Sequence, residues 1–283
     1  MILLDQSGAG AKESRLFPPS HRQAFFVEHF WVQPNPSVPI GRSWRVIPEA
    51  NPNLIFAISR TDGGSIRTRC CLVGPRSRFA DVSMENRILT CGVRLRAGAL
   101  PLLTRFPASN FTDRSVQVEE VFGLRGRSLM DRLNQFRSPI QAVRILADFL
   151  GREVAGCDCV LPFSQQRCNR VEEMASQAGM PLRTLHSRFM QQVGLSPKRL
   201  LRIERLQRAL THSRGHSVPW AQLAMGCGFA DQAHMIREFQ DLLGESPTVW
   251  RSRSALPISS RQLPTWSRNS AAGLDSKFTP FNL

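Results

Sequence analysis

Short apolar runs, several of them alternating with polar residues, fill the chain between residues 23 and 97. Turn-forming Pro, Gly, Asn and Asp residues separate one run from the next. Alternation with a period of two is typical of half-buried β-strands, and short strands at this spacing indicate a small sandwich or barrel. The strands are predicted at residues 25–32, 43–47, 53–59, 66–73 and 87–95.

The hydrophobic period becomes helical further along the chain. Apolar residues recur three and four positions apart up to Phe136, and again from Ile140 to Leu150. Between these stretches, Ser138 and Pro139 fit a helix start, because serine caps free backbone amides and proline is tolerated in the first turn. We therefore expect a pair of helices that either packs on the β-rich domain or forms a dimer interface.

Residues 164–254 contain an internal repeat with a period of about 50 residues. A small residue, a glycine and two apolar residues four positions apart recur in the same order, and each copy ends in Gly-x-Ser-Pro. The matched pairs are Ala175 and Ala224, Gly179 and Gly228, Leu185 and Met235, Phe189 and Phe239, and the closing Ser196-Pro197 and Ser246-Pro247.

Each copy has the features of a helix-turn-helix. Alanine lets a second helix cross closely, glycine permits the turn, and the apolar pair faces inward, so the outer face of the second helix is free to enter a DNA major groove. Between the copies, a helix of about 15 residues would be about 22 Å long. Such a connector could hold two recognition helices roughly one DNA turn apart. The alternative is a helical bundle with no role in nucleic-acid binding.

These patterns predict an α+β multidomain fold. A β-rich N-terminal domain, a small barrel or sandwich with a helical pair, precedes an all-α C-terminal domain of two helix-turn-helix units joined by a long helix. The expected divisions are a flexible tail at 1–20, a β-rich sensor domain at 21–123, the helical pair and linker at 124–163, the double helix-turn-helix at 164–254 and a disordered tail at 255–283.

The chain is strongly basic, with 37 Lys and Arg residues against 22 Asp and Glu residues and a net charge of +15. The excess is spread over both halves, so net charge alone does not locate a nucleic-acid site. One stretch stands out, because the residues from Arg183 to Arg214 include Glu204 as their single acid. This run either neutralises DNA phosphates or forms a solvated helix face.

The region from Val171 to Arg251 closely resembles the DNA-binding domain of the AraC/XylS family. The likeness is carried by "GLSPKRLLRIERLQRAL" and "GCGFADQAHMIREFQDLLGESPTVWR". A weaker likeness to an N-terminal domain of some such regulators lies in "FFVEHFWV", "RVIPEANPNLIF" and "GVRLRAG". The resemblance implies a bacterial transcription regulator that binds double-stranded promoter DNA, with RNA polymerase, a small-molecule effector and a second copy of the chain as further expected partners.

The resemblance also implies roles for individual residues. Arg183 is expected to bond guanine and Gln232 adenine, since these side chains match the edges of those bases. The expected base contacts are Arg183, Thr184, His186, Ser187, Gln232, Ala233, His234, Ile236 and Arg237. The expected phosphate contacts, which position the protein without specifying sequence, are Arg188, Lys198, Arg199 and Arg202.

Other classes of protein find little support in the sequence. No nucleophile elbow, phosphate-binding loop or zinc-protease motif is present, so we expect no enzyme and no cofactor. No apolar window is long enough for a membrane span, and the first residues lack a secretory signal, so we expect a cytoplasmic protein. The seven cysteines show no standard zinc spacing, and we expect no bound metal.

Two other regulator types remain open. One is a constitutive DNA-binding protein whose N-terminal half is only a scaffold. The other is a thiol- or metal-responsive regulator that uses Cys70, Cys71 or the cluster of Cys157, Cys159 and Cys168.

Overall fold

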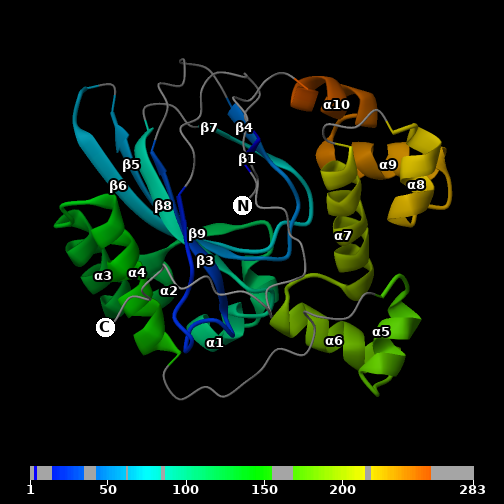
Figure 1. Cartoon of the computed structure of the whole chain (residues 1–283). Helices are drawn as coiled ribbons and strands as arrows, with labels where there is room; N and C mark the ends of the chain where they lie inside the picture. The colour runs from blue at the N-terminus through cyan, green and yellow to red at the C-terminus, as the bar shows by residue number, and fades with distance from the viewer. Residues whose placement is uncertain are drawn as a thin grey trace, which may run out of the picture.

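The computed structural model describes residues 3–4, 15–34, 43–61, 63–83, 87–154, 168–213 and 218–255. Figure 1 shows a β-rich N-terminal part beside a helical C-terminal part, in which one long helix stands between two groups of shorter ones. The predicted α+β layout is confirmed.

The N-terminal part is built on two antiparallel sheets. The larger sheet has the strand order β2-β3-β8-β5-β6-β9, and the smaller has the order β1-β4-β7. The strands of the larger sheet are β2 (Arg15–Phe17), β3 (Val27–Pro34), β5 (Asn53–Arg60), β6 (Ile66–Val73), β8 (Arg87–Leu95) and β9 (Ser115–Gln117). Those of the smaller sheet are β1 (Leu3–Leu4), β4 (Ser43–Val46) and β7 (Ala80–Ser83).

All the predicted strands are present, and most of their apolar residues are buried. Phe30, Phe56 and Val93 lie on neighbouring strands and pack into the same core. The expectation of a loose tail at 1–20 is wrong for β1 and β2, since Leu3–Leu4 pairs with β4 and Arg15–Phe17 pairs with β3.

Helices cover the outer face of the larger sheet (Figure 1). Ser138 caps α4 by accepting a hydrogen bond from the Gln141 amide at 3.2 Å, as the Ser-Pro pair predicted. Val143 and Leu146 of α4 are buried in the sheet core, so the helical pair packs on the β-rich domain. The helical segments here are α1 (Leu100–Thr104), the 3-10 turn η1 (Ala108–Phe111), α2 (Val118–Phe122), α3 (Leu124–Asn134) and α4 (Pro139–Glu153).

The C-terminal part consists of helices that share one core. Phe189 and Phe239 are fully buried in it, as the matched apolar positions of the repeat require, and so is Trp250. The helices are α5 (Val171–Gln177), α6 (Leu182–Gln192), α7 (Pro197–His212), α8 (Trp220–Cys227), α9 (Gln232–Leu243) and α10 (Pro247–Ala255).

The two parts of the chain are in direct contact. Ile47 and Ala50, which follow β4, are buried in the core of the C-terminal helices and not in that of the sheet. The last part of the predicted helical pair and linker (155–163), the first residues of the predicted double helix-turn-helix (164–167) and the predicted tail beyond Ala255 lie outside the described residues.

Candidate DNA-binding surface

Each copy of the repeat folds as two helices joined by a glycine turn. Gly179 between α5 and α6 has a φ of 60°, and Gly228 between α8 and α9 has a φ of 84°. This left-handed conformation favours glycine, since a side chain would strain it. Ala175 and Ala224 are buried at the helix crossings. The repeat therefore makes two helix-turn-helix units, with α6 and α9 as their second helices.

The first recognition helix, α6, presents a basic face. Leu185 and Phe189 are fully buried, which turns the opposite side of the helix outward. The exposed residues on that side are Arg183, Thr184, His186, Ser187 and Arg188. Within the described part of the chain, neither Arg183 nor Arg188 takes part in an ion pair. Both guanidinium groups are available to an outside partner.

The second recognition helix, α9, presents fewer unpaired charges. Gln232, Ala233 and Arg237 are exposed, whereas His234 and Ile236 are half-buried. The Nδ1 atom of His234 accepts a hydrogen bond from the Ala230 amide at 3.2 Å, and its Nε2 atom lies 3.6 Å from Glu238 Oε1. His234 is therefore held against its own turn and helix.

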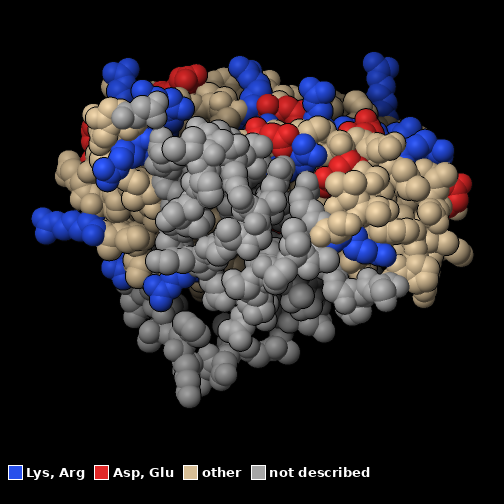
Figure 2. Space-filling view, turned by 90° about the horizontal axis from the view of Figure 1, so that it is seen from above, with Lys and Arg blue, Asp and Glu red and all other residues tan. Residues whose placement is uncertain are grey.

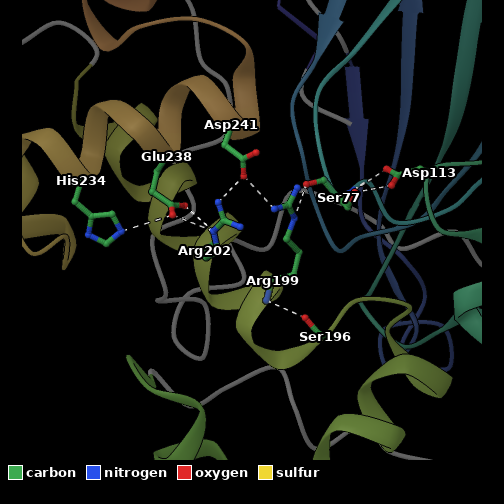
Figure 3. A network of polar contacts seen from close by, with 8 residues as sticks. All are labelled: Ser77, Asp113, Ser196, Arg199, Arg202, His234, Glu238 and Asp241. Atoms are coloured by element: carbon green, nitrogen blue, oxygen red, sulfur yellow. Dashed lines mark hydrogen bonds and ion pairs between the residues drawn. The ribbon is translucent and has the colours of Figure 1, made fainter.

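The connecting helix α7 divides its predicted phosphate contacts into two groups. Lys198 is exposed. Arg202 instead donates through Nε to both carboxylate oxygens of Glu238, at 2.9 and 3.0 Å, and through Nη2 to Asp241 (Figure 3). Arg199 donates through Nη1 to Asp241 at 3.2 Å. These two arginines bind carboxylates of α9, and only a part of each side chain is exposed.

Electrostatics reinforce this network. Burial by itself would raise the pKa of Asp241, but hydrogen bonds and charges from Arg202 and Arg199 lower it below the ordinary value. Burial would likewise lower the pKa of Arg202, and the hydrogen bonds to Glu238 and Asp241 raise it instead. Both groups stay charged at neutral pH, so the network acts as a fixed tie between α7 and α9.

Sequence reasoning missed Glu238 and Asp241 as structural partners. The signal was present in the repeat, since with the offset of the repeat these acids replace Arg188 and Gln191 of the first copy. The first replacement reverses the charge and the second adds a negative one. Two new acids beside two arginines of α7, Arg199 and Arg202, indicate an ion-pair network. Figure 2 shows acidic and basic side chains interspersed on the end of the molecule that carries α8, α9 and α10.

Other kinds of site find no support in the described residues. No group of three His, Cys, Asp or Glu side chains there is placed to hold a metal ion. Burial raises the pKa of the Cys70 thiol, and raises that of Cys91 to about 12, which keeps both protonated and unreactive. Cys157 and Cys159 lie outside the described residues. Within the part of the chain that the structure covers, no helix is both long and apolar enough to cross a membrane.

Comparison with known families matches two segments of the chain. Residues 174–253 match the family described as a helix-turn-helix domain, and residues 15–117 match a domain of unknown function, DUF6597. The transcriptional activator RhaS of Klebsiella pneumoniae is 38% identical over 85 residues, which are 30% of each chain. RhaS of Pectobacterium atrosepticum is 30% identical over 109 residues, or 37% of this chain and 38% of the relative. The chain thus spans about a third of the length of these relatives.

Two solved structures are also similar to the chain. The DNA-binding domain of AdpA, solved in complex with a target DNA, has 28% identity, covers 31% of this chain and 78% of its own, and gives a TM-score of 0.29. ToxT from Vibrio cholerae has 10% identity, covers 80% of this chain and 99% of its own, and gives a TM-score of 0.39. From the family match, the RhaS relatives and the repeat geometry, residues 174–253 of this chain are a helix-turn-helix domain of the AraC type.

Proposed function

We propose that the chain is a sequence-specific transcription regulator that binds promoter DNA with α6 and α9 in successive segments of the major groove. The observation that carries this proposal is the exposure of equivalent faces on the two recognition helices, which one continuous helix of 16 residues connects. Two helices on one rigid connector match the spacing of adjacent major-groove segments on one side of a duplex.

The two recognition helices take different parts in this proposal. Arg183 of α6 forms a bidentate contact with a guanine, and Gln232 of α9 contacts an adenine. Arg188 and Lys198 bind phosphates, because both side chains are exposed and neither is in an ion pair among the described residues. Arg199 and Arg202 contribute less to phosphate binding, because Asp241 already binds both guanidinium groups and Glu238 also binds that of Arg202.

The N-terminal domain supplies regulation in this proposal, through a small-molecule effector or a second copy of the chain, and RNA polymerase is the further partner. A constitutive regulator with a scaffold domain is the competing form, and it predicts that no small molecule changes the thermal stability or the DNA affinity. A thiol-responsive form is disfavoured for Cys70, because its raised pKa keeps the thiol protonated. Screening metabolites by thermal shift, followed by DNA titration with each hit, separates the first two forms.

Selection of bound sequences from a random DNA pool tests the proposal directly. Two enriched blocks about 10–11 base pairs apart are expected if both helices read bases. One block would mean that a single helix specifies sequence while the other holds phosphates. An absence of enrichment, with steep salt dependence, would overturn sequence-specific binding, because it is the behaviour of a basic surface that attracts any duplex.

A further inference from the structure

The β-rich domain contacts the equivalent point of both helix-turn-helix units. In the repeat, Gly194 after α6 corresponds to Gly244 after α9, and both have a positive φ, of 79° and 70°. A Cβ atom at Gly194 would lie 2.8 Å from the Ala108 carbonyl oxygen. A Cβ atom at Gly244 would lie 2.5 Å from the Phe79 ring. The N-terminal domain thus approaches the end of each recognition helix closely, through its backbone at Gly194 and through the Phe79 side chain at Gly244.

Hydrogen bonds accompany the approach at the first unit. The Thr112 hydroxyl, just after η1, donates to the Gly194 carbonyl. The neighbouring Asp113 carboxylate accepts a hydrogen bond from the Ser77 amide at 2.8 Å and another from the Ser77 hydroxyl. Arg199 at the start of α7 donates through Nε to the Ser77 carbonyl at 2.9 Å (Figure 3). One connected set of contacts therefore runs from the β-rich domain to the turn between α6 and α7.

A second set of contacts holds the end of α9. The Phe79 amide donates to the Leu242 carbonyl at 2.9 Å, and Arg45 of β4 donates through Nη1 to the Leu243 carbonyl at 3.1 Å. Arg45 is itself fixed, because Asp81 accepts two hydrogen bonds from it, both at 2.9 Å. Its guanidinium carbon lies 4.4 Å from the centroid of the Phe79 ring.

The middle of the connector is held as well. Gln207 of α7 donates through Nε2 to the Pro48 carbonyl at 2.9 Å, next to the buried Ile47. The Arg199 side chain joins the two ends of the interface, since it bonds Ser77 of the β-rich domain and Asp241 of α9. The contacts touch α6, α7 and α9, the three helices whose mutual positions determine how the recognition helices meet DNA.

We propose that the β-rich domain clamps the C-terminal ends of α6 and α9 and so fixes their separation, which makes Arg45, Phe79 and Thr112 positioning residues for the spacing of the two DNA blocks. This inference rests on the proposed DNA binding. Without the clamp, α7 alone would join the units, and small rotations at its ends would let the protein accept blocks at several spacings with similar affinity.

Two substitutions remove clamp contacts. Thr112→Val deletes the hydroxyl that bonds Gly194 and keeps the size of the side chain. Arg45→Met keeps an unbranched chain but deletes the guanidinium that bonds Leu243, together with its ion pairs to Asp81 and Glu245. Each has a matched control elsewhere in the same domain. Thr68→Val deletes a hydroxyl that bonds Asn134 at 2.7 Å, and Arg132→Met removes an ion pair with Asp148 at 3.0 Å. The test compares the double clamp variant with the double control variant.

Affinity is measured on duplexes that carry the selected blocks 9, 10, 11 or 12 base pairs apart, and on a duplex with one block. The wild type and the control variant are expected to prefer one spacing by at least about tenfold, and the clamp variant by less than about threefold, because the lost hydrogen bonds hold one geometry. Affinity for the single block should agree among all the proteins within about twofold. A clamp variant that keeps the full spacing preference would overturn the proposal.

Calorimetric unfolding tests the clamp without DNA. The wild type should unfold in one transition that couples the two domains, and the clamp variant in two, because the interface that couples them is weakened. A single unchanged transition in the clamp variant would also count against the proposal. If the wild type selects no DNA sequence but shows these transitions, the clamp stands as a domain interface, and it is the proposed DNA reading that fails.

Discussion

The two helix-turn-helix units have one pattern and two different surroundings. In the first unit, Arg188 and Gln191 lie on the exposed side of α6, with no carboxylate of the described residues paired to the arginine. In the second, the matched positions hold Glu238 and Asp241, which bind two arginines of α7. The two copies of one fold thus differ, because α6 keeps an exposed basic face while ion pairs bind α9 to α7. The difference lies in two residues of each recognition helix.

Removal of Glu238 should give the largest effect on stability, because this buried carboxylate accepts two hydrogen bonds from Arg202 of α7. The change affects the second unit and leaves the first unit intact. Glu238→Ala leaves Arg202 half-buried with a single carboxylate partner, and we expect a loss of about 2–3 kcal/mol in the free energy of unfolding. Urea denaturation at neutral pH measures this.

The matched change in the first unit, Arg188→Ala, provides the contrast. This side chain is exposed and unpaired among the described residues, so the free energy of unfolding should change by less than about 0.5 kcal/mol while affinity for every DNA sequence falls. Equal destabilisation by the two substitutions would remove the distinction between the units.

Base discrimination should depend more on the first unit than on the second. Arg183→Ala is expected to cost about 1–2 kcal/mol of preference at a single base position, through loss of a bidentate contact. The matched residue in α9 is Ala233, which offers a methyl group only, so Ala233→Gly should change preference little. Affinities for a panel of single-base variants of the selected site provide the measurement. A uniform loss across the panel for Arg183→Ala would assign that arginine to phosphate.

Replacement of Lys198 is expected to have a smaller effect. Comparison with Arg202 then distinguishes an exposed cation of α7 from one that binds carboxylates. Lys198→Ala should weaken binding to all duplexes and reduce the slope of log affinity against log salt by about one. Arg202→Ala should reduce that slope by less, because Glu238 and Asp241 already neutralise its charge, although it should destabilise the fold. Similar slopes for these two variants would show that the carboxylates release Arg202 on binding.

The smallest expected effect is on the pH dependence of the free energy of unfolding. Because Arg202 and Arg199 lower the pKa of Asp241, its ion pairs contribute stability that is fully present above the unfolded pKa of about 3.9 and is lost as pH falls through the lower folded value. Asp241→Asn should therefore destabilise by a few tenths of a kcal/mol at pH 6 and by less at pH 3, since the side chain is half exposed. Gln191→Asn, the matched change in α6, should show no such pH dependence in urea denaturation.

Strands and helices with full periods were predictable from the sequence. The runs at 53–59 and 66–73 match β5 and β6 within one residue, because turn-forming residues bound a short apolar run in each case. The strands β1, β2, β7 and β9 span two to four residues, too few for a period to be seen. They are strands because a neighbouring strand pairs with them: β2 pairs with β3, β9 pairs with β6, and both β1 and β7 pair with the short strand β4.

Exposure of the predicted base contacts other than His234 and Ile236 also followed from the repeat, since the buried Leu185 and Met235 orient each recognition helix. The partners of those side chains did not follow. Whether Arg199 meets a phosphate or a carboxylate depends on the angle between α7 and α9, which is a property of tertiary packing. His234, which is predicted to contact a base, hydrogen-bonds the Ala230 amide and lies 3.6 Å from Glu238, and the linear pattern could not reveal these partners.

The burial of Ile47 and Ala50 in the helical core bears on how such a protein can be recombined. A chimaera that joins residues 168–255 to an unrelated sensor would leave an apolar socket on the helices where these side chains sit, and the new partner would not fill it. Transfer of residues 168–255 alone should therefore give a poorly soluble protein, unless the segment around Ile47 is included. The part of this chain that can be transferred as a unit is larger than the stretch that carries the helix-turn-helix pattern.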